Sequence, residues 1–199
     1  MKELETIELF IKDEEDGVFA ISLVESPAIQ ENFVALSSHT MELKAVDDER
    51  RIVVGYALIP DKPIYRKQKI NGEVKEFNIK FSDQTVAKSA ELYMKNLNLA
   101  NVTSEHERPV EGCCVIESWI TEDTKHDKIN LYDIKPIKGG WAVMMKLYND
   151  EEYQKAKSGE YKGFSIEAMF DGFEQLASKE EKTYTEEEVL EMLKNLLED

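Results

Sequence analysis

The sequence predicts a mostly β protein of the α+β class, and three observations lead to that prediction. Short runs rich in β-branched and aromatic residues recur along most of the chain, each bounded by Gly, Pro, Asn or Asp. Only three stretches are predicted to be helices, from apolar residues at helical spacing or from capping residues at both ends. A chain of 199 residues, with 42% hydrophobic and 33% charged residues, suits one globular domain with a substantial core. So many short strands in one domain favour a barrel or a sandwich.

The predicted strands extend from the start of the chain to residue 170. They are residues 6–11, 18–24, 52–58, 74–81, 113–120, 128–134, 141–147 and 163–170. In the last of them, alternation predicts that the even-numbered residues, which are apolar, face the core. Ser165, Glu167 and Met169 then share the opposite face, which would bring a hydroxyl and a carboxylate side by side.

Two of the predicted helices lie within the main part of the chain. Residues 82–97 have Ser82 or Asp83 as the capping residue. The apolar residues expected on one face of this helix are Val86, Ala90, Tyr93, Met94 and Leu97. Residues 149–158 are expected to form a short polar helix, with Asn149 as N-cap and a glycine directly after its end.

The C-terminal segment is predicted to stand apart from the rest of the chain. We assign residues 1–177 to one domain and residues 178–199 to a linker followed by an amphipathic helix. The linker, residues 178–183, is charged and poor in core residues. Thr185 and Glu188 form a capping-box pattern before an apolar stripe. We expect that stripe to pack on the domain, and a partner helix is the alternative.

The charge of the chain argues against one class of partner. Its formal net charge is -16 at pH 7, whereas a nucleic-acid binder places Lys and Arg against phosphates. We therefore predict no nucleic-acid partner. No run approaches the ~20 apolar residues of a membrane span, and the acidic start lacks an apolar signal core. We predict a protein of the cytoplasm with no membrane partner.

No cofactor and no metal site is predicted. Cys113 and Cys114 are adjacent, which strains a disulfide, and neither has a Cys-x-x-Cys partner, so we expect both to be reduced. A metal site built from Asp123, His126 and Asp127 is conceivable. The hydrophilic segment that contains them is more typical of a solvated hairpin turn.

One histidine and one serine remain as candidates for nucleophilic chemistry. His106 lies in a charged segment before a proline, without a His-Glu-x-x-His zinc pattern, whereas His39 lies in a polar break and is expected to be exposed. Ser165 needs a base to take its proton, and a histidine suits that role near neutral pH. A third group usually orients the imidazole. The residues alone leave open whether these side chains are catalytic or ordinary surface positions.

Four segments in order give the chain a family resemblance. They are Ser-Glu-His-Glu at 104–107, Val-Ile-Glu-Ser-Trp-Ile at 115–120, Gly-Gly-Trp-Ala-Val-Met-Met-Lys-Leu at 139–147, and Lys-Ser-Gly-Glu-Tyr-Lys-Gly-Phe-Ser-Ile-Glu-Ala at 157–168. Together they resemble the XkdF-type phage serine proteases, relatives of the prohead proteases of tailed phages. The resemblance covers roughly residues 15–172 and is strongest from Gly159 to Glu167.

The resemblance implies a fold, a reaction and partners. The fold would be the assemblin-like β-barrel with flanking helices that herpesvirus maturation proteases share. The reaction would be peptide hydrolysis through an acyl-enzyme, inside the assembling procapsid in the bacterial host cytoplasm. Substrates would be phage scaffold and major capsid proteins and the protease itself, with a homodimer or other self-association possible. A non-catalytic head-assembly or scaffold-associated protein with the same fold is the alternative, and an acidic binding module is a third.

The resemblance also assigns site residues. His106 matches the base of the family and Ser165 its nucleophile. Related proteases place their third member on a strand position that falls near Ala20 here, and an alanine cannot serve. Glu167 is the candidate because it shares a predicted face with Ser165. The alternatives are Glu117, Glu25 or no third side chain.

Overall fold

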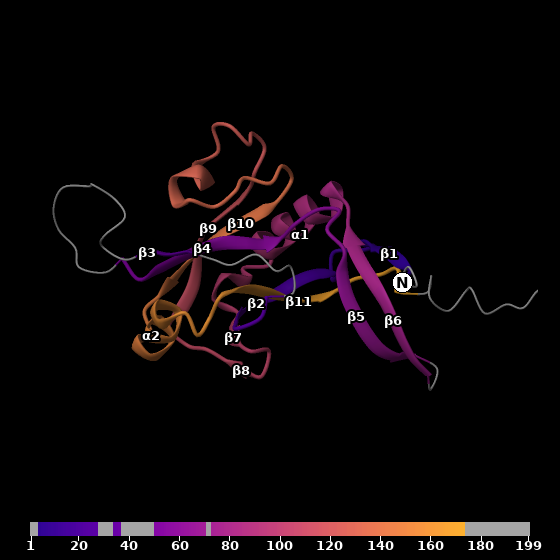
Figure 1. Cartoon of the computed structure of the whole chain (residues 1–199), viewed down its shortest axis with the longest axis horizontal. Coiled ribbons are helices and arrows are strands. Elements are labelled where there is room, and N and C mark those ends of the chain that lie inside the picture. Colours follow the sequence, from indigo (N-terminus) through magenta and orange to yellow (C-terminus); the bar gives the residue numbers. More distant parts are fainter. Residues whose placement is uncertain (1–3, 28–33, 37–49, 71–72, 174–199) are drawn as a thin grey trace, which may run out of the picture.

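The computed structural model describes residues 4–27, 34–36, 50–70 and 73–173, which form three β-sheets and two α-helices (Figure 1). The strands are β1 (Thr6–Leu9), β2 (Gly17–Val24), β3 (Val34–Leu36), β4 (Ile52–Leu58), β5 (Ile64–Ile70), β6 (Glu73–Phe81), β7 (Val102–Ser104), β8 (Arg108–Pro109), β9 (Cys113–Ile120), β10 (Trp141–Leu147) and β11 (Gly163–Met169). The helices are α1 (Asp83–Lys95) and α2 (Asp150–Ser158), with 3-10 turns η1 (Asn98–Ala100) and η2 (Lys128–Tyr132). In this part of the chain, no helix has the length and apolar character needed to cross a membrane.

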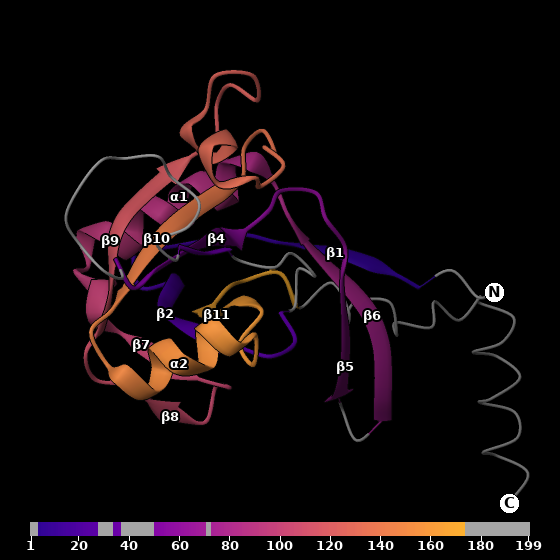
Figure 2. The ribbon, with the colours of Figure 1, turned by 60° about the vertical axis from the view of Figure 1, so that its left-hand side comes forward.

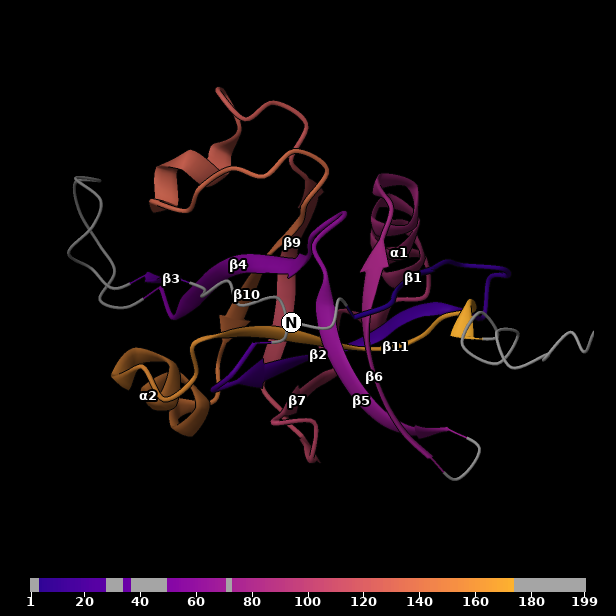
Figure 3. The ribbon, with the colours of Figure 1, turned by 45° about the vertical axis from the view of Figure 1, so that its right-hand side comes forward.

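The predicted α+β class with a majority of strands is confirmed, but the expected closed barrel is not found in the described residues. The strand orders are β1-β6-β5, β3-β4-β10-β9 and β11-β2-β7-β8. A barrel needs the first and last strands of one sheet to pair with each other. Here each sheet is open: β11 and β8, for example, end the third sheet at opposite edges. The hairpin of β5 and β6 extends away from the other two sheets (Figure 3).

The three sheets share one hydrophobic core instead of closing individually. A single cluster of buried side chains draws on all three, including Ile7 and Phe77 from the first sheet and Leu23 from the third. Trp141, from the central strand β10, is fully buried and meets the ring of Tyr93 on α1 edge-on, with ring centroids 5.3 Å apart. The burial of these large apolar surfaces is the main force that holds the sheets together.

All but one of the predicted strands are found, and the exception is residues 128–134. This segment contains the 3-10 turn η2 instead. The side chain of Asp127 accepts a hydrogen bond from the backbone N–H of Ile129, which starts the turn, and Asp133 ends it with φ 55°. Local capping therefore outweighs the β propensity of the segment. The sequence does not predict β3, β5, β7 or β8.

Helix α1 confirms the helix predicted over residues 82–97, with Ser82 as its N-cap. Its packed face differs from the prediction. The buried side chains are Thr85, Val86, Ser89, Ala90, Leu92 and Tyr93. Met94 and Leu97 are 41% and 79% exposed instead. Leu97 lies beyond the helix end with φ 57°, so it has left the helical spacing on which the prediction rested.

Helix α2 confirms the second predicted helix together with both of its ends. Asn149 caps it by accepting from the backbone N–H groups of Glu151 and Glu152, and Gly159 ends it with φ 79°. The third predicted helix, the linker before it and His39 lie outside the described residues, so the division at residue 177 stays a prediction.

The cap of α2 gives a stability prediction. Replacement of Asn149 by Ala removes the acceptor for two backbone N–H groups and the donor to the Glu111 carbonyl. We expect Asn149→Ala to lower the free energy of unfolding by about 1 kcal/mol in urea denaturation. Asn149→Asp keeps the acceptor beside the helix N-terminus and should lose less. Equal losses in the two variants would contradict the capping role.

Candidate active site

Ser165 lies on β11, at the edge of the third sheet. Its direct cross-strand partner on β2 is Ser22, and the partner of Ser22 on the next strand, β7, is Thr103. Side chains directly opposite one another in a sheet project from the same face, so the three hydroxyl groups form a row across three strands. Phe164, on the other face, is buried in the core as predicted, while Ser165 is 8% exposed.

His106 lies in the turn between β7 and β8, beside that row. Glu105 and His106 have φ of 52° and 59°, and the backbone N–H of Glu107 donates to the carbonyl of Ser104 over 2.9 Å. Two successive positive φ angles inside such a hydrogen bond are the signature of a type I′ turn, which ordinarily favours Asn-Gly. A non-glycine residue in this region costs about 1–2 kcal/mol. The turn is therefore strained at both central residues.

Three hydrogen bonds attach this strained turn to β2 and the residue after it. The backbone N–H of His106 donates to the hydroxyl of Ser22 over 3.0 Å. The N–H of Glu105 donates to the carbonyl of Leu23 over 3.1 Å. The carboxylate of Glu105 accepts from the backbone N–H of Glu25 over 2.7 Å. Ser22 is fully buried, so the bond to His106 is shielded from water.

The imidazole of His106 meets the carboxylate of Glu167. Nδ1 of His106 and Oε1 of Glu167 are 3.3 Å apart, and Thr103 donates a short hydrogen bond to the same oxygen. The side chains of His106 and Glu167 are 41% and 23% exposed. A carboxylate at Nδ1 favours the tautomer that carries its proton there, which leaves Nε2 free to accept one. Among the described residues, no hydrogen bond joins the Ser165 hydroxyl to the His106 ring.

The other two carboxylates considered as the group that orients the His106 imidazole have different partners. Glu117, on β9 in another sheet, forms an ion pair with Lys128. The carboxylate of Glu25 lies 3.7 Å from Nζ of Lys162 and is 67% exposed, although its backbone supports the His106 turn. Of the three candidates, Glu167 is the one whose carboxylate contacts His106.

The three residues considered for a metal site make separate contacts. Asp123 and His126 pair at 2.7 Å on an exposed turn. The carboxylate of Asp127 is turned to Trp119 and to the backbone of Ile129. No cluster of three potential metal ligands occurs in residues 4–27, 34–36, 50–70 and 73–173.

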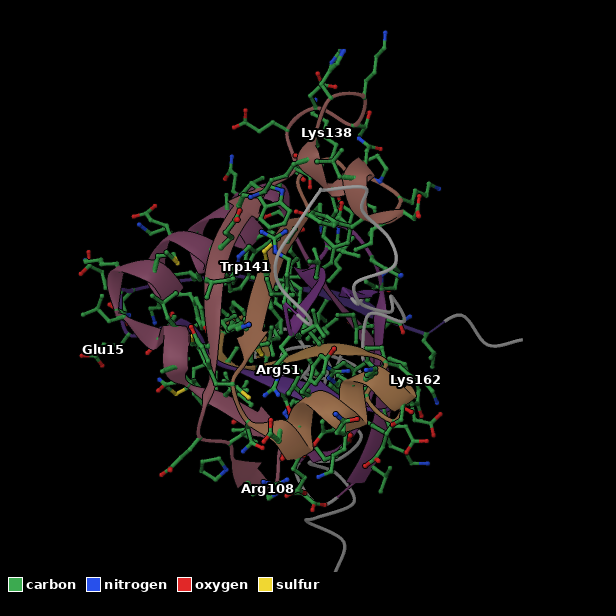
Figure 4. The ribbon with its side chains drawn as sticks, turned by 90° about the vertical axis from the view of Figure 1, so that its left-hand side faces the viewer. Glu15, Arg51, Arg108, Lys138, Trp141 and Lys162 are labelled. Atoms are coloured by element: carbon green, nitrogen blue, oxygen red, sulfur yellow. The ribbon has the colours of Figure 1, made fainter. Side chains whose placement is uncertain are left out.

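Sequence reasoning missed a group of residues behind the His106 turn. Tyr161 and the fully buried Glu152 join Ser104 and Arg108, which lie at the two ends of the turn, in one network. Figure 4 shows Arg108 beside the helix that carries Glu152, α2. The sequence held no signal for this network, because a glutamate in a short polar helix is ordinarily solvent-exposed.

Comparison with known protein families gives a match over most of the chain. The model of a protein family described as "Putative phage serine protease XkdF" matches residues 40–174. No curated protein and no solved structure shows a significant match to the chain. The matched residues are more than half of the chain and include the turn of His106, β11 and α2.

The strain at His106 can be measured directly. Both His106→Ala and His106→Gly remove the imidazole, but only glycine adopts φ 59° without steric conflict. We expect the glycine variant to unfold with a free energy about 1 kcal/mol higher than the alanine variant. At His126, where φ is not positive, the same pair of substitutions should show the opposite order. If alanine were the more stable replacement at both histidines, the turn would not be strained.

Proposed function

The chain belongs to the XkdF family of phage serine proteases, and from that premise we propose that it is a serine endopeptidase that matures the phage prohead. Its substrates would be scaffold and major capsid proteins, and the protease itself. It would act in the bacterial host cytoplasm, inside the assembling procapsid, with self-association of the protease as a further proposal. The acidic chain, with a net charge of -16, would be repelled by DNA, which favours action before packaging.

One observation carries the proposed mechanism. His106 contacts a carboxylate through Nδ1 and is attached through its backbone to Ser22, the cross-strand partner of Ser165. In the mechanism, Oγ of Ser165 attacks the substrate carbonyl while Nε2 of His106 takes the hydroxyl proton and passes it to the leaving amine. Water then hydrolyses the ester on Ser165 by the reverse proton transfers. Glu167 would orient the imidazole and stabilise its cation.

The position of Glu167 also supports the proposed relationship to assemblin-like proteases. Its direct cross-strand partner is Ala20, the position near which the third member of related proteases is expected. A carboxylate on β11 would thus supply the charge that β2 does not. The assemblin-like ancestry of the fold remains part of this proposal.

The nucleophile can be tested by co-expression with the scaffold and capsid proteins. We expect wild type to cleave them, and Ser165→Ala to abolish cleavage while heads still assemble, with products followed by intact mass. Ser158→Ala removes another serine hydroxyl, exposed at the end of α2, and should leave cleavage unchanged. If heads assemble normally in the presence of the wild-type chain but the scaffold and capsid proteins stay uncut, the non-catalytic head-assembly role would be favoured instead.

The carboxylate proposed to orient His106 can be tested by three matched amide variants. Glu167→Gln removes the charge that faces His106, and we expect cleavage to slow by about 100-fold or more, because a positioned acid contributes strongly to such sites. Glu117→Gln and Glu25→Gln should cleave at nearly the wild-type rate, since their carboxylates pair with lysines. Equal cleavage rates in all three variants would mean that Ser165 and His106 act as a pair, without a carboxylate partner.

A further inference from the structure

The two ends of the His106 turn are connected to one buried carboxylate. Ser104 and Arg108 are cross-strand partners on β7 and β8, and they enclose the three residues of the turn. Ser104 lies opposite Leu23, so its side chain is on the core face of the sheet, opposite to the row of Ser165 and Ser22. Both of these flanking side chains reach Glu152 on α2, one of them through Tyr161.

The hydrogen bonds of this network have a defined direction. The hydroxyl of Tyr161 donates to Oε2 of Glu152 over 2.5 Å, so its oxygen is left to accept from the hydroxyl of Ser104, also over 2.5 Å. The guanidinium of Arg108 donates to Oε1 of Glu152 over 2.5 Å. Each carboxylate oxygen thus holds one strand of the hairpin. Burial, and next the hydrogen bond to Glu152, raise the pKa of Tyr161, which keeps its proton in place.

Glu152 is itself held firmly. It lies in the first turn of α2, where the helix N-terminus favours a negative charge, and its backbone N–H is capped by Asn149. Its side chain is 1% exposed, whereas the preceding Glu151 is 68% exposed. Tyr161 is also fixed, because the next residue, Lys162, donates its backbone N–H to Val24 at the start of the β11 pairing. Figure 2 shows α2 at the same end of the molecule as β7 and β8.

We propose that Glu152 and Tyr161 are positioning residues, which hold the His106 turn in register with Ser165 from behind the sheet; this inference rests on the proposed function. The ion pair of the buried Glu152 with the half-exposed Arg108 adds little net stability, so stability alone does not account for a buried carboxylate at this place. Strained backbone, in contrast, persists only where its surroundings over-determine it. The network supplies that constraint at both ends of the turn.

The test uses the full chain and three variants. Tyr161→Phe removes one hydroxyl and keeps the ring, and Glu152→Gln keeps the shape and removes the charge. Glu151→Gln is the matched control, because Glu151 also lies near Arg108, at 3.8 Å, but is exposed. Two readouts are taken after thermal unfolding has confirmed the fold: the rate at which a fluorophosphonate modifies Ser165, by intact mass, and the ring resonances of His106 by NMR, assigned with His106→Ala.

We expect Tyr161→Phe and Glu152→Gln to shift or broaden the His106 resonances. We also expect both variants to slow the modification of Ser165 by between about tenfold and about 100-fold, since small misplacements of a catalytic group have effects of this size. Glu151→Gln should match wild type in both. If these two variants fold and leave the His106 resonances unchanged, the positioning role is overturned, whatever the rate of Ser165 modification. A wild type that never reacts would overturn the proposed function, while the resonances would still decide the role of the network. If Glu152→Gln does not fold, Tyr161→Phe decides alone.

Discussion

The hydrogen bond from the backbone of His106 to the hydroxyl of Ser22 is the contact on which the candidate site depends. It joins a turn that has no intrinsic preference for its own conformation to the central strand of the Ser165 sheet. Since β2 pairs with both β11 and β7, any shift of β2 would displace the strand of Ser165 and the strand that leads into the His106 turn together. The relative position of the two side chains is therefore set by strand register, which a packed sheet holds rigidly.

The two faces of this sheet carry different parts of the candidate site. On one face, Glu167 meets the ring of His106 and Thr103, and this face reaches solvent at the histidine. On the other, Ser104 enters the buried network of Tyr161 and Glu152. Groups that meet a peptide must be accessible, whereas groups that fix geometry hold better where water does not compete for their hydrogen bonds. Alternation along β7 provides both, because Thr103 and Ser104 point to opposite faces.

Sequence reasoning predicted most of the strands and the pairing of Ser165 with Glu167 on one face, because both follow from a period of two. It failed where short-range capping or long-range closure decides the outcome. Asp127 turns an apparent strand into a 3-10 turn, and no periodicity shows that β7 and β8 pair across His106. The network around Glu152 was also out of reach. A glutamate in a polar helix carries no sign that it will be buried against an arginine more than 40 positions away.

The pairing of β11 with β2 explains how a carboxylate on β11 reaches the imidazole of His106. The register of β11 against β2 is regular from Gly163 to Glu167, which places Glu167 opposite Ala20, and it shifts only after Glu167. Because Ala20 leaves space on the neighbouring strand, the longer side chain of Glu167 can cross toward Thr103 and the imidazole. A bulky residue at position 20 would fill that space and would hinder the contact between Glu167 and His106.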